Sequence, residues 1–142
     1  MSIYADTSFL ISLYSLDANS AAAVQTMQAS TGERYITVLG ELEVVNALQL
    51  RLFRKELSAT QVQSSLDDFE KDMRDGVFLL RPLAEQVFAR AHQLARQTTA
   101  RLGTRTADLL HVASALQLEA DYLYTFDQQQ RRLARTLGLK LN

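Results

Sequence analysis

The sequence predicts an α/β protein, a three-layer sandwich in which helices cover both faces of a mostly parallel sheet of five strands. Three observations support this. Five short apolar or aromatic segments alternate with longer segments of helical periodicity. Residues 104–127 run from a helix through a short linker into a strand, which is half of the crossover that joins parallel strands. The length of 142 residues suits one domain with a substantial core, and no interdomain linker interrupts it, so residues 1–142 are predicted to be a single domain.

The first half of the chain is predicted to contain two strands and three helices. Residues 2–5 and 34–37 are short β-rich segments typical of strands. Residues 9–16 are apolar and begin a helix, and a second helix spans residues 20–30 before a Thr-Gly break. Residues 40–55 place leucine and valine side chains on one helical face, which predicts a third helix.

The second half alternates in the same way. Ser58 is predicted to cap an amphipathic helix that ends at Gly76, and Pro82, the only proline, stops the strand that follows. The remaining predicted elements are a strand at 77–80, a helix at 84–98, a helix capped by Thr104, a strand at 122–126, a helix at 128–137 and a strand at 139–141. Helices that separate strands in this way favour parallel pairing.

The composition is that of an ordinary globular protein and excludes several kinds of site. Hydrophobic residues make up 47% of the sequence and charged residues 22%. The absence of cysteine excludes disulfides, thiolate nucleophiles and zinc–thiolate or iron–sulfur sites. His92 and His111 are the only histidines, so an imidazole-built metal site is not expected. With no signal-peptide pattern and no apolar stretch that approaches a membrane span, we expect a cytoplasmic protein.

The net charge of −1 is unevenly distributed along the chain. From Arg90 to the end there are eight basic and four acidic residues, whereas residues 67–75 contain five acidic and two basic residues. The positive C-terminal part is compatible with binding a phosphate backbone. It is equally compatible with a solvated surface, so charge alone does not identify a partner.

Four carboxylates are predicted to meet at one edge of the sheet. Asp6 and Asp127 follow two predicted strands, and ligands of parallel sheets bind beyond the carboxyl ends of the strands. Asp108 stands in the first turn of one helix and Glu43 early in another, so both can reach that edge. Clustered carboxylates repel one another unless cations are present, and oxygen-only ligands suit Mg²⁺ or Mn²⁺. Such an ion can polarise a phosphodiester and activate water, which predicts phosphodiester chemistry.

Each of these acids also has an ordinary structural role open to it. Asp6 and Asp127 can cap the helices that follow them, and Asp108 can complement a helix dipole. Glu43 can be a solvated side chain. Glu41 competes with Glu43 for the site, but residues two apart on a helix are separated by about 200°, so both cannot line one small site.

Hydroxyl groups, an arginine and a histidine accompany the acids. Hydroxyls near them in sequence are those of Thr7 and Ser8 after Asp6, Thr37 before Glu43, Thr106 before Asp108 and Thr125 before Asp127. They can orient carboxylates, or they can be routine strand and turn residues. Arg105 can pair with an acid or with a phosphate. His111, one turn after Asp108, is either a hydrogen-bonded core histidine, which we favour, or a hydrogen-bonding partner of a metal ligand.

Four segments together resemble the signature blocks of PIN-domain proteins, most nearly those of the small VapC-type ribonuclease toxins. The segments are Ile3-Tyr4-Ala5-Asp6-Thr7-Ser8, Glu43-Val44-Val45-Asn46-Ala47-Leu48, Asp108-Leu109-Leu110-His111-Val112-Ala113 and Tyr124-Thr125-Phe126-Asp127. They keep the order of the family and span nearly the whole chain. The position of Thr37, six residues before Glu43, and the run that begins at Glu43 favour this residue over Glu41. Thr7 and Thr125 match positions that often carry a hydroxyl in the family.

The resemblance implies a PIN domain whose first strand lies at the centre of a five-stranded parallel sheet. It implies an endoribonuclease that depends on Mg²⁺ or Mn²⁺ and leaves 5′-phosphate and 3′-hydroxyl ends. The catalytic and metal-binding acids would be Asp6, Glu43, Asp108 and Asp127. Arg105 and Arg131 would position the RNA backbone. The resemblance also implies a homodimer that a small DNA-binding antitoxin neutralises.

Apolar residues in two mid-chain helices also predict a homodimer. They are Phe53, Leu57, Val62 and Leu66. Together they offer more apolar surface than one face of a sheet obviously needs, although they can also pack on each other.

Two alternatives to a toxin nuclease remain. A non-catalytic or stand-alone PIN protein that only binds RNA or a partner would not need four acids, and all four are present. A metal-dependent phosphatase of similar α/β layout would need a lysine near the site. The only lysines, Lys55, Lys71 and Lys140, do not follow a plausible strand end, so the nuclease is favoured.

Overall fold

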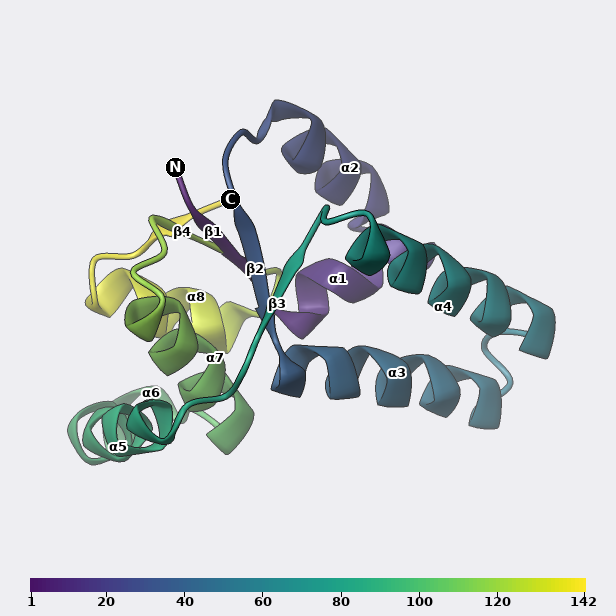
Figure 1. Cartoon of the computed structure of the whole chain (residues 1–142). Coiled ribbons are helices and arrows are strands. Elements are labelled where there is room, and N and C mark those ends of the chain that lie inside the picture. Colours follow the sequence, from purple (N-terminus) through teal and green to yellow (C-terminus); the bar gives the residue numbers. More distant parts are fainter.

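Five parallel strands form the centre of the molecule in the computed structural model, which describes residues 1–142 (Figure 1). The strands are β1 (Ile3–Ala5), β2 (Arg34–Thr37), β3 (Leu79–Arg81), β4 (Tyr122–Tyr124) and β5 (Lys140–Leu141). Their order is β3-β2-β1-β4-β5, and every neighbouring pair is parallel. The predicted five-stranded parallel sheet with the first strand at its centre is therefore confirmed.

Helices cover both faces of this sheet, which confirms the predicted α/β/α sandwich (Figure 1). One layer contains α1 (Thr7–Tyr14), α2 (Ser20–Ala29), α3 (Val38–Phe53) and α4 (Ala59–Arg74). The other contains α5 (Glu85–Leu94), the π-helical segment η1 (Ala95–Thr99), α6 (Ala100–Leu102), α7 (Thr106–Gln117) and α8 (Gln128–Thr136). None of these helices combines the length and the apolar character needed to cross a membrane.

Alternation along the central strand directs side chains into two separate hydrophobic cores. Ile3 and Ala5 of β1 pack with α1, α2, α3 and α4, whereas Tyr4 between them packs with α5, α7 and α8. Phe9 of α1 and Leu48 of α3 are fully buried in the first core. Because β1 is anchored in both cores, the position of Asp6, the residue directly after it, is fixed by packing on both faces.

The start of α7 differs from the prediction that Thr104 caps it. Arg105 occupies the cap position, and the Asp108 carboxylate accepts a hydrogen bond from the Arg105 backbone amide at 2.9 Å. The Thr104 hydroxyl instead lies 2.9 Å from the Thr99 hydroxyl. The side chain that satisfies this helix start is therefore the Asp108 carboxylate, and not the Thr104 hydroxyl.

Two other predicted boundaries also shifted. The helix predicted at 84–98 loses its α-helical pattern after Leu94, where the Thr98 hydroxyl donates to the Leu94 carbonyl at 2.6 Å within the π-helical turn. The strand predicted at 77–80 begins at Leu79, because the Val77 amide donates to the Asp72 carbonyl and closes the end of α4. Gly76, with φ of +75°, makes this closure possible.

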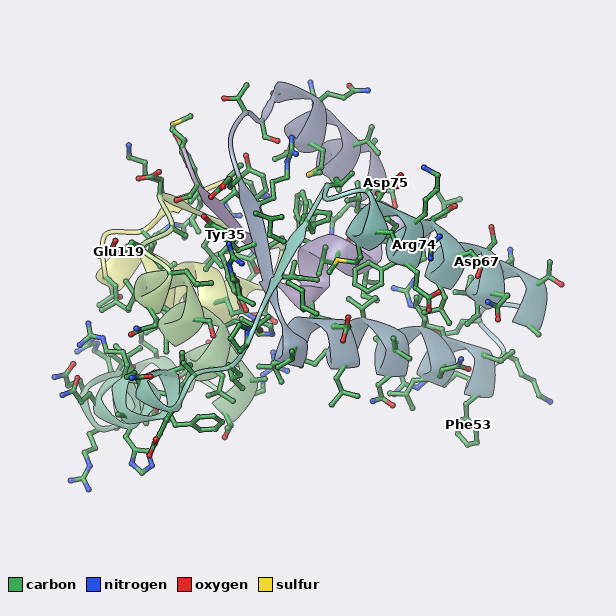
Figure 2. All side chains as sticks on the ribbon, in the orientation of Figure 1. Tyr35, Phe53, Asp67, Arg74, Asp75 and Glu119 are labelled. Carbon is green, nitrogen blue, oxygen red and sulfur yellow. The ribbon has the colours of Figure 1, made fainter.

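The large apolar side chains of α4 pack within the chain, whereas several on α3 are exposed. Ser58 caps α4 as predicted, in a reciprocal arrangement with Gln61. Val62 and Leu66, which were expected to offer apolar surface for a second copy, are buried in the first core. Phe53 at the end of α3 is 82% exposed and projects away from the rest of the molecule (Figure 2).

Candidate active site

The carboxyl ends of β1, β2 and β4 and the N-terminus of α7 lie at one edge of the sheet, and each predicted acid belongs to a segment that begins there. Asp6 follows β1 directly, and Asp127 follows β4 after two residues. Glu43 lies in α3, which starts at the end of β2, and Asp108 lies in the first turn of α7. The parallel topology therefore brings four distant parts of the sequence to a common edge.

Asp6 is fully buried and is held by three hydrogen bonds. One carboxylate oxygen accepts from the Ser8 hydroxyl at 2.7 Å and from the Phe9 backbone amide at 2.9 Å, which caps α1. The other oxygen accepts from the Thr125 hydroxyl at 2.5 Å. Burial raises the pKa of the Asp6 carboxyl, and His111 together with these hydrogen bonds offsets only part of that rise. The fold thus compensates the charge of Asp6 incompletely.

Glu43 is held by side chains alone. Its Oε1 atom accepts from the Thr7 hydroxyl at 2.7 Å and lies 2.5 Å from His111 Nε2. Burial by itself would raise the pKa of Glu43, but the interactions with His111, Thr7 and Arg105 lower the pKa below its ordinary value. The other ring nitrogen of His111 lies 2.8 Å from the Tyr4 hydroxyl. His111 is therefore a hydrogen-bonded core histidine and a partner of Glu43 at the same time.

Arg105 lies between Asp108 and Asp127 and contacts both. Its Nη2 atom donates to Asp127 at 2.8 Å, and its Nε atom donates to Asp108 at 3.3 Å. Asp127 also accepts from the Gln130 backbone amide at 3.0 Å and so caps α8. The Arg105 side chain is 69% exposed, so water and salt screen both ion pairs. In this arrangement a single exposed guanidinium balances two carboxylates.

The three predicted supporting hydroxyls differ in their contacts. Thr7 and Thr125 each donate to a carboxylate of the site. Thr37 is buried and lies 3.2 Å from the Tyr4 hydroxyl, so it reaches Glu43 only through Tyr4 and His111. Tyr4 is the residue that the sequence analysis missed. A tyrosine in the middle of an otherwise apolar central strand was the available signal, because a buried hydroxyl needs a partner.

Other charged residues considered for this edge have different roles. Arg131, expected to position RNA, donates to the Thr125 carbonyl at 2.9 Å and to the carbonyl of Asn142 at 3.4 Å, and so holds the chain next to β4. Glu41 lines a groove between α3 and α4 with Leu42 and Phe69.

Of the three lysines, Lys71 pairs with Asp75, Lys140 lies over the Tyr122 ring and Lys55 follows α3. No lysine therefore stands in the position that the phosphatase alternative requires.

The donor set fits a hard divalent cation by its chemistry. The four predicted acids supply carboxylate oxygens and neither sulfur nor imidazole is required of them, which suits Mg²⁺ or Mn²⁺. As the side chains lie in this structure, no three His, Asp or Glu residues form a group that could hold one ion. Arg105 engages Asp108 and Asp127, while hydroxyls engage Asp6. A cation at this edge would therefore require Asp108 and Asp127 to exchange Arg105 for the ion.

The fold and the acids at its carboxyl edge define the class of protein. The model of the PIN domain family matches residues 3–136. The chain therefore belongs to the PIN-domain family, as the four sequence blocks predict. No curated protein matches the sequence.

Several solved structures share this fold across almost the whole chain. The VapC20 toxin of Mycobacterium tuberculosis, described as cleaving the sarcin–ricin loop, is 15% identical with a TM-score of 0.71, and the match covers 92% of this chain and 93% of the toxin. VapBC2 of Rickettsia felis, solved with a promoter DNA fragment, is 18% identical with a TM-score of 0.69 and coverage of 100% and 98%. FitAcB of Neisseria gonorrhoeae is 17% identical with a TM-score of 0.68 and coverage of 98% and 95%. At these identities the likeness establishes the fold.

Replacing Asp6 by asparagine is expected to increase the free energy of unfolding in metal-free buffer at neutral pH. Burial raises the pKa of Asp6, so the folded state disfavours its charged form, and the neutral amide removes that penalty. The difference in free energy of unfolding between Asp6→Asn and the unaltered protein should shrink as the pH falls through the raised pKa of Asp6, because Asp6 itself then becomes neutral. Urea unfolding in EDTA at neutral and at mildly acidic pH measures both effects.

Glu41→Gln is the matched control, because Glu41 lies outside the acid network and its replacement should change stability by less than about 0.5 kcal/mol at either pH. If Asp6→Asn proves less stable than the unaltered protein at neutral pH, the hydrogen bonds to the carboxylate outweigh the penalty of its burial.

Proposed function

We propose that this PIN-domain protein is a Mg²⁺- or Mn²⁺-dependent endoribonuclease and the toxin of a VapBC-type pair. The observation that carries the proposal is that two hydrogen-bonded networks hold the four acids at one edge of the sheet, one with Asp6, Asp127 and Asp108 and the other with Glu43. Thr125 links Asp6 to the Asp127 backbone, with distances of 2.5 Å and 3.0 Å. Arg105 then links Asp127 to Asp108, one turn before the histidine that contacts Glu43. Such a gathering of acids is costly for a purely structural purpose, which supports a cation-dependent role.

The metal would be held by Asp6, Glu43, Asp108 and Asp127. When bound, the ion would supply Lewis-acid polarisation of the phosphodiester and activation of water. The residues of the chain would do the rest. Thr7 and Thr125 hold the Glu43 and Asp6 carboxylates in fixed orientations through their hydroxyl donors. Pre-set ligand orientations of this kind reduce the reorganisation that the reaction requires.

In the proposed reaction a water oxygen forms a bond to phosphorus while the bond between phosphorus and the ribose 3′-oxygen breaks. The water loses a proton and the leaving 3′-oxygen gains one, which gives a 5′-phosphate and a 3′-hydroxyl. Arg105 is the basic residue best placed to contact a phosphate, because its side chain is exposed and already stands over two of the acids. With Asp108 and Asp127 holding a cation, the Arg105 guanidinium would be free to bind a non-bridging phosphate oxygen.

A second copy of the chain is proposed to cover the outer face of α3. Four apolar side chains recur on that face at helical spacing with exposures of 36–82%, namely Val38, Leu42, Val45 and Phe53. Phe53 projects into solvent from the end of the helix (Figure 2). Large apolar side chains that share one exposed helical face favour self-association over solvation. Of the apolar residues expected to form the dimer surface, Phe53 belongs to this stripe, whereas Val62 and Leu66 of α4 face the core.

The proposed antitoxin is a small DNA-binding protein with a basic tail. A groove between α1, α2 and α4 is lined by Leu13, Tyr14, Val24 and Met27, and its wall contains Asp68, Asp72 and Lys71, of which Lys71 is paired with Asp75. An apolar floor with an acidic wall suits an amphipathic basic segment. At the sheet edge, an arginine or lysine from the same tail would pair with the acids in place of the cations. VapBC2 of Rickettsia felis and VapBC-1 of Haemophilus influenzae are VapBC proteins of the same fold, which supports a partner of this kind.

RNA cleavage is expected to require a divalent cation and Glu43. Purified protein incubated with unstructured and looped RNA should cleave it in Mg²⁺ or Mn²⁺ and not in EDTA. Glu43→Gln should lower the rate by about 100-fold or more, the scale on which the loss of one electrostatic group slows an active site. Glu41→Gln should cleave at the rate of the unaltered protein. Cleavage that survives chelation, or that depends on Glu41 and not on Glu43, contradicts the assignment.

Phe53→Asp is expected to convert a dimer into a monomer without unfolding it. The side chain is 82% exposed, so its replacement should change monomer stability by only about 0.5 kcal/mol, while a charge would be buried in the proposed interface. Light scattering of both proteins at micromolar concentration measures the change. Phe88→Asp, on the opposite helical layer and 47% exposed, is the matched control and should remain dimeric. An unaltered protein that is already monomeric would refute the dimer.

The toxin assignment predicts a short neighbouring gene that encodes a DNA-binding protein. Co-expression of the two proteins should give a complex that copurifies and that cleaves RNA far more slowly than the free nuclease. A complex that cleaves as fast as the free protein, or the absence of such a gene, would leave a stand-alone PIN nuclease.

A further inference from the structure

Glu43 differs from the other three acids in how it is held. Asp6, Asp108 and Asp127 each accept a hydrogen bond from a backbone amide at the start of a helix. Glu43 is the sixth residue of α3, beyond the first turn, where the backbone amides bond within the helix. Only side chains can therefore fix its carboxylate, and those that do are Thr7 and His111.

His111 is placed to do this with little freedom of its own. It is 1% exposed, on α7, with Nε2 at 2.5 Å from Glu43 and Nδ1 at 2.8 Å from the Tyr4 hydroxyl. The Tyr4 hydroxyl also lies 3.2 Å from the Thr37 hydroxyl. These contacts form a series from Thr37 at the end of β2, through Tyr4 of β1 and His111 of α7, to Glu43 of α3. Every residue of this series except Glu43 is almost completely buried.

The hydrogen positions in this chain follow from what each group can donate. The Glu43 carboxylate only accepts, so Nε2 of His111 carries a hydrogen and donates it. The Tyr4 hydroxyl, 2.8 Å from Nδ1, can then donate its hydrogen to that nitrogen. Thr37 then donates to the Tyr4 oxygen. In the resulting arrangement Thr37 donates to Tyr4, Tyr4 donates to His111, and His111 donates to Glu43.

We propose that His111 is a positioning residue, which holds the Glu43 carboxylate toward the other acids through Nε2 and thereby sets the affinity of the site for its divalent cation. Tyr4 and Thr37 fix the ring in the tautomer that donates to Glu43. The inference rests on the proposed function, because it assigns His111 to the metal site of that nuclease. Side chains that orient a metal ligand commonly change metal affinity by roughly 10–100-fold when replaced.

Two amide variants separate positioning from simple core filling. The side-chain amide nitrogen of glutamine can take the place of Nε2, so His111→Gln keeps a donor for Glu43 and loses the contact with Tyr4. The shorter asparagine places its amide near Nδ1, so His111→Asn keeps a contact with Tyr4 and loses the donor for Glu43. Both variants remove an aromatic ring from the core, so both should lower thermal stability to a similar degree.

The measurement is Mn²⁺ binding by isothermal titration calorimetry, with RNA absent. We expect His111→Gln to bind Mn²⁺ nearly as well as the unaltered protein and His111→Asn to bind about tenfold or more weakly. Equal affinities for the two folded variants would overturn the positioning role, even if the unaltered protein binds Mn²⁺ and cleaves RNA. Failure of the unaltered protein to bind Mn²⁺ would instead overturn the proposed metal site itself, and the role of His111 with it.

A second measurement needs no change to the core. Nitrogen-15 spectra of the unaltered protein report which ring nitrogen of His111 carries the hydrogen, and only the exposed His92 has to be distinguished from it. His92→Gln makes that assignment. A hydrogen on Nε2 is the expected result. A ring that carries its only hydrogen on Nδ1 would overturn the proposal, because Nε2 would then have nothing to donate to Glu43.

Discussion

The compensation of clustered negative charge is the constraint on which the rest of this site depends. Carboxylates removed from water are stable in a protein only when donors or cations replace the lost hydration. This chain supplies such partners from three sources. Backbone amides at helix starts serve Asp6, Asp108 and Asp127, an exposed guanidinium serves two of these, and a buried imidazole serves Glu43.

The parallel topology makes that compensation possible. Every strand ends at the same edge, so the helices that follow β1, β2 and β4 all begin there and present free amide groups and positive dipole ends. The crossover through α7 adds a further helix start. The edge of the sheet that gathers the acids therefore also gathers the backbone amides that balance their charge.

The two side chains that balance these acids, Arg105 and His111, differ in how easily they can be displaced. Arg105 is mostly exposed, so its ion pairs contribute little to stability and can be exchanged for a metal ion or a phosphate. His111 is buried and bonded on both ring nitrogens, so breaking its contact with Glu43 would leave polar groups unpaired inside the core. Asp108 and Asp127 can thus change partners easily, whereas the carboxylate of Glu43 is held in place.

The sequence by itself determined the fold class, the parallel sheet with β1 at its centre, the family and the segments that carry the four acids, because periodicity, caps and the four sequence blocks are local signals. Only the tertiary structure showed that Arg105 bridges two acids, that Tyr4 contacts His111, that Arg131 donates to backbone carbonyls and that Val62 and Leu66 face the core. These contacts depend on the packing of side chains after the strands pair. Tyr4 and His111 are separated by 107 positions, and no local pattern specifies which nitrogen meets which hydroxyl.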